Sequence, residues 1–198
     1  MTPLALIRHG ATLWNETGRM QGQTDVPLSD TARHALAQRK PPAPLAGFTW
    51  VSSPLSRAAE TARLLAPPRT EIAIVPELTE MSWGAWEGHT LHALRQQHGE
   101  GFDANADRGL DFRPPGGESP RMVQARLQPW LARVGAAGVP TAAVAHKGVI
   151  RAVFGLATGW NFMGKPPAWL DFSAVQLFMV DATARIRVER LNLLLEPR

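Results

Sequence analysis

The stretch Leu4-Ala5-Leu6-Ile7-Arg8-His9-Gly10 decides how the rest of the chain is interpreted. Four apolar residues end abruptly at an arginine, a histidine and a glycine, as expected where a buried parallel strand reaches the edge of its sheet. In open α/β sheets, ligands bind just beyond the carboxyl ends of the strands. Arg8 and His9 are therefore candidate site residues, and their weight depends on whether other strands of the chain end in the same way.

A second apolar stretch is followed by polar residues in the same way. The pattern predicts a strand over Phe48–Ser53 and a helix over Pro54–Leu65, with Ser53 at the N-cap and proline at the first helical position. This arrangement places Arg57 in the first turn of the helix. A second set of polar groups is thus expected at the carboxyl end of a strand.

A third strand, Thr141–Ala145, ends at His146 and precedes a predicted helix over Val149–Ala157. The carboxyl ends of neighbouring parallel strands meet at the same edge of a sheet. We therefore expect His9, Arg57 and His146 to lie side by side, although they are far apart in the sequence.

Strands and helices alternate along most of the chain. This alternation predicts one domain over residues 1–198, built as a three-layer α/β/α sandwich with a mostly parallel sheet. The last two strands are left free to run antiparallel at an edge. The other expected elements are a loop over residues 14–27, helices over 32–39, 91–97 and 121–134 with Ser29 and Ser119 capping the first and last, and strands over 71–75, 174–180 and 186–195.

The regular alternation falls away between Pro76 and Glu118. Long irregular segments inside a domain are more often functional walls or lids than disorder when they carry tryptophans. We expect residues 81–118 to form a substrate-covering elaboration of the domain, and the choice of substrate to depend on it.

Composition excludes several classes of protein. The 198 residues include no cysteine, which excludes disulfide bonds and thiolate chemistry. The net charge is +4, but the arginines are scattered and no basic, aromatic-rich strand or recognition helix is visible, so we expect no nucleic-acid partner. No apolar run reaches membrane-spanning length, and residues 1–3 show none of the basic, apolar and cleavage-site features of a leader. We expect a cytoplasmic protein with no membrane partner.

Two histidines, two arginines and a carboxylate in one pocket suit phosphoryl transfer from a monoester. The planar guanidinium groups of Arg8 and Arg57 would neutralise the phosphate dianion. One histidine could act as a nucleophile, and the other could donate a hydrogen bond to the developing charge. Glu80, flanked by tryptophans, is the expected acid for the leaving oxygen, with Glu77 and Glu87 as alternatives.

Six motifs occur in a fixed order along the chain. They are Arg8-His9-Gly10 with Thr12 and Trp14-Asn15, Gly22 with Asp25–Ser29, Ser52–Ala62, Glu80–Gly88, Pro115–Ser119, and His146–Arg151. Together they span residues 4 to about 155. The sequence resembles the histidine phosphatase superfamily, in the branch shared by cofactor-dependent phosphoglycerate mutases and small bacterial phosphatases.

The resemblance implies a phosphoglycerate mutase-like fold with no metal and no cofactor. It implies that His9 is the phosphorylated nucleophile and that Arg8, Arg57 and His146 complete the phosphate pocket. It also implies that Glu80 is the proton donor, which would act as the base on water in a second step.

The resemblance adds three candidate substrate-binding residues and shows departures from the family's pattern at three positions, one of them Thr12. Asn15 looks like a pocket residue, Gly22 lies where the loop passes close to the ligand, and Thr12 keeps the hydroxyl of a frequent serine. Lys147 stands where a glycine is usual and adds a cation at the pocket rim. Ala32 replaces a frequent glycine, and neither change removes a catalytic group.

These residues leave three hypotheses about function. The first is a phosphomonoester hydrolase that acts on a small phosphorylated metabolite through a phosphohistidine. The second is a phosphoglycerate mutase, but the resemblance implies a longer insertion than the interval Met81–Ala145 provides. The third is a non-catalytic module that binds a phosphorylated ligand, which would not need both a nucleophile and an acid. A homodimer is left open.

Overall fold

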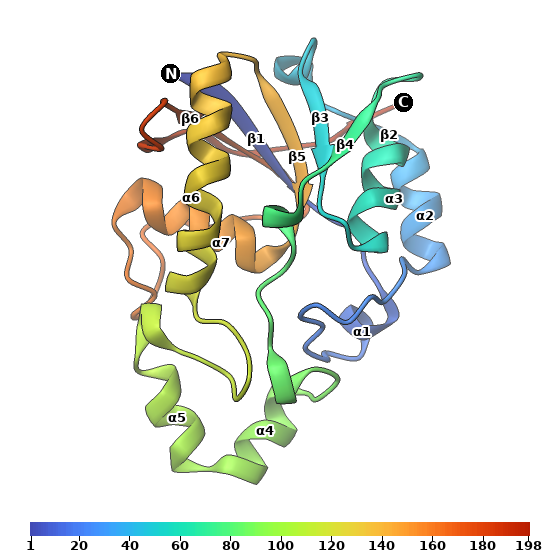
Figure 1. Cartoon of the computed structure of the whole chain (residues 1–198). Helices are drawn as coiled ribbons and strands as arrows, with labels where there is room; N and C mark the ends of the chain where they lie inside the picture. Colours follow the sequence, from blue (N-terminus) through green and yellow to red (C-terminus); the bar gives the residue numbers. More distant parts are fainter.

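The computed structural model describes residues 1–198 and contains a six-stranded sheet with helices on both faces (Figure 1). The sheet strands are β1 Thr2–Arg8, β3 Thr49–Ser52, β4 Ile72–Ile74, β5 Thr141–Ala145, β6 Val175–Val180 and β7 Ile186–Leu193; β2 Arg39–Lys40 and β8 Glu196–Pro197 form a separate pair. The α-helices are α1 Leu13–Glu16, α2 Asp30–Ala37, α3 Ser56–Leu65, α4 Leu91–His98, α5 Glu100–Ala106, α6 Pro120–Ala137 and α7 Lys147–Thr158. None of them combines the length and apolar character that a membrane span requires.

The strand order in the sheet is β4-β3-β5-β1-β6-β7. The first four of these strands run parallel to one another, whereas β6 is antiparallel to both β1 and β7. The predicted sandwich with a mostly parallel sheet is confirmed, and so is the antiparallel pairing of the last two strands. Because β3, β5 and β1 are neighbours, the three strand ends that carry the candidate residues lie next to one another.

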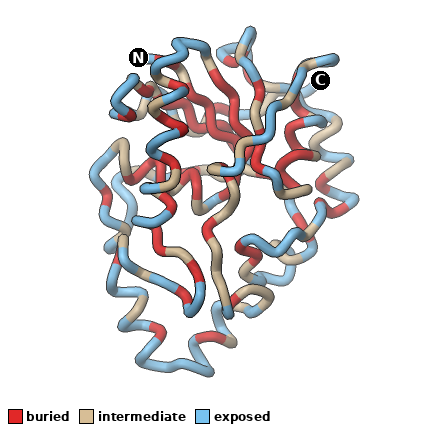
Figure 2. The backbone as a smooth tube through the Cα atoms, viewed as in Figure 1, coloured by how far each residue is buried: buried red, intermediate tan, exposed pale blue.

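Strand β1 is buried on both faces, which explains its continuous apolar sequence. Leu4 and Leu6 pack into a core shared with α6 and α7, while Ala5 and Ile7 pack on the opposite face into a core shared with α3. Burying each leucine or isoleucine contributes about 1.5–3 kcal/mol. Figure 2 shows the buried residues concentrated in the sheet and in the helix faces that cover it.

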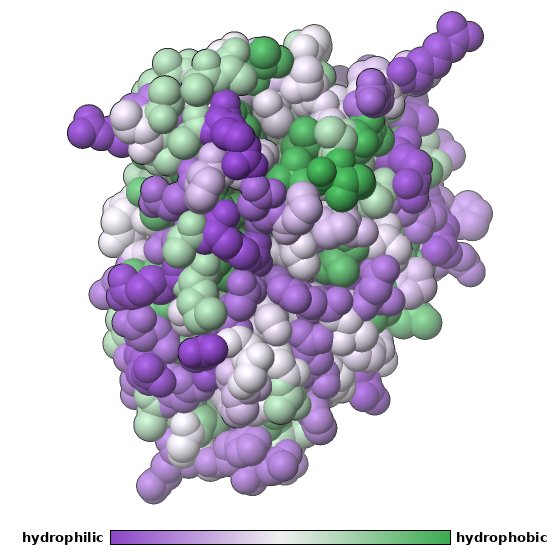
Figure 3. Space-filling model, in the orientation of Figure 1, coloured by the Kyte–Doolittle hydropathy of each residue, from purple (hydrophilic) through white to green (hydrophobic).

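Strand β4 forms one edge of the sheet and is short, as exposed edges usually are. Ile74 at its end is 52% exposed. Figure 3 shows an apolar area on the surface over this edge, whereas the lower half of the same face is mostly polar.

The start of α3 differs from the prediction. The helix begins at Ser56 with Leu55 as its N-cap, so the prediction of Ser53 as N-cap and Pro54 as first helical residue was wrong. The hydroxyl of Ser53 instead accepts a hydrogen bond from the Leu55 amide at 3.3 Å and bonds to His146 at 2.8 Å. The caps at Ser29 and Ser119 are confirmed.

The segment between β4 and α6 is more regular than its sequence indicates. Helix α4 is confirmed, but α5 was missed, and Gly99 with a φ of 50° joins the two. Trp86, Leu94 and Phe102 form a small apolar core of their own there. The short helix α1 was missed as well, because the segment 14–27 has no apolar period. Figure 1 shows α4 and α5 at the end of the molecule opposite both termini.

Candidate active site

Backbone hydrogen bonds of the sheet hold the three strand ends together. The His9 amide donates to the carbonyl of Ala145 at 3.0 Å, and the Ser53 amide donates to the carbonyl of Val144 at 3.0 Å. These bonds place the first residue after β1 and the first residue after β3 on either side of the end of β5. As a result, the ring centroids of His9 and His146 are 5.1 Å apart.

His9 is held in one tautomer. Its Nδ1 is 2.7 Å from the carbonyl oxygen of Gly10, so Nδ1 carries the proton and donates, and Nε2 carries a free lone pair. Burial, followed by the charges of Arg8 and Arg57, lowers the pKa of His9 to about 3. The ring is therefore neutral at pH 7 and Nε2 is available as a nucleophile.

Arg57 is fully buried and is oriented by the loop before α2. Its Nη1 donates to the carbonyl of Thr24 at 2.9 Å, and its Nη2 donates to the carbonyl of Gly22 at 2.7 Å. Gly22 has a φ of +53°, and a Cβ there would lie 1.9 Å from Oε1 of Glu87. Glycine is thus required at this position, where the loop lines the site and holds the arginine.

Several buried polar atoms at the site have no partner within the protein. Of the six buried side-chain nitrogen and oxygen atoms without a hydrogen bond, three are Nε of Arg8, Nε of Arg57 and Nδ1 of His146. Leaving such a group unpaired costs about 1–3 kcal/mol. Burial also lowers the pKa of both arginines. A cluster of unpaired donors and buried cations is suited to bind an anion.

Glu80 faces the site from the segment after β4. Its carboxylate accepts hydrogen bonds from the amide of Met81 at 2.8 Å and from the amide of Gly148, the second residue of α7, at 3.1 Å. Burial raises the pKa of Glu80, although these two bonds and the nearby arginines oppose the rise. A carboxyl group with a raised pKa can serve as a proton donor near neutral pH.

Arg126 of α6 fixes the backbone around Glu80. Its Nη2 donates to the carbonyl of Thr79 at 2.6 Å and to that of Glu80 at 3.2 Å, and its Nε pairs with Glu118 at 2.9 Å. This bridge joins the segment after β4 to the start of α6. The position of the Glu80 carboxylate therefore depends on a side chain that does not itself line the site.

The two alternative carboxylates have other partners. Glu77 forms an ion pair with Arg133. Glu87 accepts hydrogen bonds from the amides of Gln23, Thr24 and Trp83. Neither lines the cavity onto which His9 and Glu80 open. The structure also contains no cluster of three or more histidine, aspartate or glutamate side chains that could hold a metal ion.

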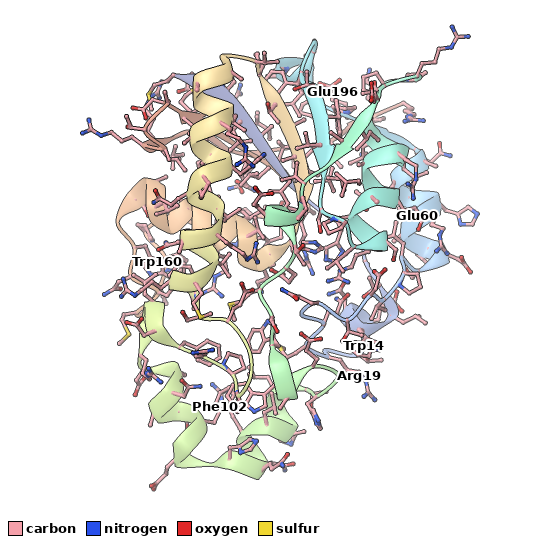
Figure 4. The ribbon with its side chains drawn as sticks, viewed as in Figure 1. Trp14, Arg19, Glu60, Phe102, Trp160 and Glu196 are labelled. Atoms are coloured by element: carbon pink, nitrogen blue, oxygen red, sulfur yellow. The ribbon has the colours of Figure 1, made fainter.

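This cavity has a volume of about 510 Å³, a size typical of small-molecule sites. Arg8, His9, Arg57 and Glu80 line its sheet side. The aromatic and apolar lining includes Trp83, Leu91, Phe102 and Phe112 of the segment 81–118, together with Phe162, which follows α7. Figure 4 places the labelled Phe102 on the α4–α5 side and Arg19 near α1. The cavity thus lies between the sheet edge and the segment 81–118.

The remaining predicted residues divide into two groups. Asn15 and Gly22 line the cavity, whereas Thr12 and His146 do not. Thr12 is fully buried, and its hydroxyl accepts from the amide of Asn15 and donates to Oδ1 of Asn15, both at 3.2 Å. Thr12 therefore caps α1 and orients Asn15, which leaves only the NH₂ group of Asn15 free to face a ligand.

Sequence reasoning missed three arginines that line the cavity, Arg19, Arg95 and Arg151. Arg151 could have been found, because it lies four residues after Lys147 and so falls on the same face of the predicted helix. Nothing in the sequence separates Arg19, in an irregular segment, or Arg95, in α4, from the other arginines of the chain.

The comparison with known families decides the identity of the chain. The family model for the histidine phosphatase superfamily (branch 1) matches residues 4–183. The chain belongs to the histidine phosphatase superfamily. The resemblance noted in the sequence is thereby confirmed over most of the chain.

Within this superfamily, the chain is similar to both mutases and phosphatases. It is 34% identical over 135 residues to a probable phosphoglycerate mutase, GpmB, from Enterobacter sp. (strain 638), a match that covers 67% of this chain but only 62% of that protein's length. It is 31% identical over 176 residues to a metal-independent phosphoserine phosphatase from Arabidopsis thaliana, covering 83% of this chain and 72% of that one.

Solved structures of histidine phosphatases extend the similarity to the whole fold. A mycobacterial glucosyl-3-phosphoglycerate phosphatase, solved in complex with VO3, superimposes with a TM-score of 0.80 and 27% sequence identity. The superposition covers 98% of this chain and 100% of that chain. The overall fold is therefore shared over nearly the whole of both chains.

We expect His9→Asn to reduce the loss of stability in acid. The pKa of His9 is about 3 in the folded chain and about 6.5 when unfolded, so unfolding takes up a proton between these pH values. Above pH 6.5, His9 does not lower the free energy of unfolding. Below that value, proton uptake by His9 in the unfolded chain lowers the free energy of unfolding by about 1.4 kcal/mol per pH unit until pH 3 is reached. Urea titrations at pH 7 and pH 4.5 measure the difference.

The matched control for this titration is His34→Asn, since His34 is exposed. That variant should keep the pH dependence of the parent protein. If His9→Asn shows the same pH dependence as well, His9 is not held neutral in the folded state.

Proposed function

We propose that this histidine phosphatase is a phosphomonoester hydrolase that acts on a small phosphorylated metabolite through a phosphohistidine on His9. The observation that carries the proposal is the neutral ring of His9, with Nδ1 bound to Gly10 and Nε2 free, between Arg8 and Arg57. The similarity to a phosphoserine phosphatase and to a glucosyl-3-phosphoglycerate phosphatase supports hydrolysis.

In the first step, Nε2 of His9 attacks phosphorus and forms an N–P bond while the ester P–O bond breaks. Protonated Glu80 transfers its proton to the departing oxygen, and the alcohol leaves. Arg8 and Arg57 neutralise the phosphoryl oxygens throughout. His146 does not itself line the cavity, but its ring lies 5.1 Å from that of His9. Because Nε2 of His146 bonds to Ser53 Oγ at 2.8 Å, Nδ1 is the group left to donate toward a phosphoryl group on His9.

In the second step, Glu80 is a carboxylate and accepts a proton from water. The water oxygen attacks phosphorus, the N–P bond breaks, and its electron pair returns to Nε2 of His9. Inorganic phosphate is released, and Glu80 is protonated again for the next cycle. One group thus acts first as acid and then as base, which requires a raised pKa.

The second candidate function is a phosphoglycerate mutase, favoured by the similarity to probable mutases. In that reaction a bound hydroxy acid, rather than water, accepts the phosphoryl group. The same residues would perform the first step. Interconversion of 2- and 3-phosphoglycerate without release of phosphate would support the mutase.

Two further predictions accompany the proposed function. Asn15 and Gly22 bind the substrate directly, and Thr12 contributes by orienting Asn15. The cytoplasmic location also stays a prediction. Whether the chain forms a homodimer stays open. Sedimentation of the purified protein would decide the oligomeric state.

We expect His9→Ala to abolish phosphate release from p-nitrophenyl phosphate, 3-phosphoglycerate and α-ribazole phosphate, because the nucleophile is lost. Phosphate release is measured with EDTA present, and a phosphoenzyme is sought after rapid quenching in base, where phosphohistidine survives. His34→Ala, which changes an exposed histidine, should retain full activity. Binding of phosphate by the unsubstituted protein with no turnover and no interconversion would favour the non-catalytic module.

We expect Glu80→Gln to reduce kcat/KM far more for alkyl phosphates than for p-nitrophenyl phosphate. An alkoxide needs a proton to leave, whereas p-nitrophenolate does not, so kcat/KM for 3-phosphoglycerate should fall about 10²–10⁴-fold. In the parent protein, kcat/KM for the alkyl ester should fall as the pH rises through the raised pKa of Glu80, and the variant should lose this dependence. An equal loss for both esters would contradict the assignment.

We expect Gly148→Ala to reproduce part of the Glu80→Gln effect. A Cβ at position 148 would lie 2.4 Å from Oε1 of Glu80, so the carboxylate must move away from the start of α7. The selective loss of kcat/KM for the alkyl ester should exceed tenfold. Gly101→Ala is the matched control, because a Cβ there meets no atom within 4 Å. Unchanged activity in Gly148→Ala would show that the acid does not need this position.

A further inference from the structure

The cavity carries more positive charge than the phosphoryl group needs. Six arginine and lysine side chains line it, against one carboxylate, Glu80; they are Arg8, Arg19, Arg57, Arg95, Lys147 and Arg151. Arg8 and Arg57 flank His9. Arg19 donates to the carbonyl of Gly88 at 2.9 Å, and Arg95 pairs with Asp103 at 3.6 Å. The side chains of Lys147 and Arg151 form no hydrogen bond and no ion pair within the protein, although both residues belong to α7.

Aromatic rings, rather than carboxylates, hold Arg151 in place. Its guanidinium carbon lies 5.0 Å from the ring centre of Trp160 and 5.2 Å from that of Phe162. These two rings stack on each other with centroids 4.3 Å apart and planes 12° apart. Figure 4 places Trp160 beside α6 and α7, on the side of the molecule away from Arg19. The guanidinium is thus positioned without its charge being neutralised.

Lys147 is positioned in a similar way at the mouth of the cavity. Its ammonium group lies 5.2 Å from the ring centre of Phe172. Lys147 and Arg151 are the first and fifth residues of α7, so both project from one face of the helix. Each lines the same cavity as His9.

This pair of cations is unfavourable for the fold alone. Two positive charges four residues apart repel each other, and the N-terminal turn of a helix is the end where positive charge is least favoured. Burial lowers the pKa of both groups, and for Lys147 the neighbouring charge of Arg151 adds to this effect. Glu80 is the nearby carboxylate, but it forms no ion pair with either cation. An anion bound between them would remove the repulsion.

The position of the pair relates it to the alcohol part of the substrate. Glu80, which protonates the leaving oxygen in the proposed reaction, accepts a hydrogen bond from Gly148, the residue next to Lys147. The cations therefore line the cavity beside the proton donor, where the alcohol leaves in the proposed reaction. Arg8 is close enough to Lys147 for its charge to lower the pKa of Lys147, whereas Arg57 has no such effect on either cation.

Building on the proposed function, we propose that Lys147 and Arg151 form a second anion subsite and that the preferred substrates are phosphomonoesters with a further anionic group on the alcohol. A carboxylate or a second phosphoryl group would satisfy the pair, because a guanidinium fork and an ammonium group bind either one. The stacked rings of Trp160 and Phe162 hold the guanidinium of Arg151 at the cavity without occupying its hydrogen-bond donors.

The test measures binding in the His9→Ala protein, which has no nucleophile, so that the result does not depend on turnover. Calorimetry compares 3-phosphoglycerate with glycerol 3-phosphate, which lacks the carboxylate, and with glycerol 1,3-bisphosphate. We expect 3-phosphoglycerate to bind at least tenfold more tightly than glycerol 3-phosphate. Adding Lys147→Met and Arg151→Met should reduce this ratio to threefold or less. Tighter binding of the bisphosphate than of 3-phosphoglycerate would identify the second anion as a phosphoryl group.

The matched control is Arg185→Met, which removes one positive charge from an exposed position outside the cavity and should leave the ratio unchanged. The proposal is overturned if the His9→Ala protein binds neither 3-phosphoglycerate nor glycerol 1,3-bisphosphate at least tenfold more tightly than glycerol 3-phosphate, or if the double substitution leaves a tenfold ratio intact. Failure of the proposed function is a different result, namely no phosphate release by the parent protein whatever the binding ratio.

Discussion

The parallel pairing of β1 and β3 with β5 is the constraint on which the site depends. Each strand supplies an apolar run that the helices cover on both faces, and each run stops at the same edge. The ladder continues one residue past the strands, through the amides of His9 and Ser53. Because the sheet fixes the backbone on both sides, the two histidine rings need no further bridge to stay together.

Desolvation gives these polar groups their chemical character. The same burial that keeps His9 neutral raises the pKa of Glu80 and lowers the pKa of Arg8 and Arg57. Water would weaken each of these effects, and it would also compete for the unpaired donors. The buried cations and unpaired donors of the site therefore carry an unfavourable electrostatic free energy, and a bound anion of the right shape reduces it. Folding energy from the two apolar cores offsets that cost.

The main features of the site could be predicted from local sequence signals. An apolar run that ends in a polar residue identifies a strand end, and three such ends are enough to predict that His9, Arg57 and His146 come together. The fold class is indicated by the same runs. The predicted roles of these residues rest on the resemblance and on geometry, and the substitutions of His9 and Glu80 address them.

Other features depend on contacts between distant segments and leave no local signal. Ser53 is a good helix cap by residue type, but its hydroxyl forms a hydrogen bond with the imidazole of His146, 93 positions away. Thr12 belongs to a motif of the family, yet it acts on Asn15 and not on the cavity. Helix α5 was missed because Gly101 and two acidic residues obscure its period; Leu94, Trp86 and Phe102 stabilise it through packing.

The separate small core beneath α4 and α5 has a consequence for how this protein can change over time. Trp86, Leu94 and Phe102 share no buried contact cluster with the two cores that support the sheet. Only the partly buried Trp83 and Phe112 pack against both this small core and a core beneath the sheet, so mutations of Trp86, Leu94 or Phe102 reach the packing around His9 only through them. Under the proposed function, substitutions at the α4–α5 end would change the wall that faces the alcohol while leaving Arg8, His9, Arg57 and Glu80 as they are.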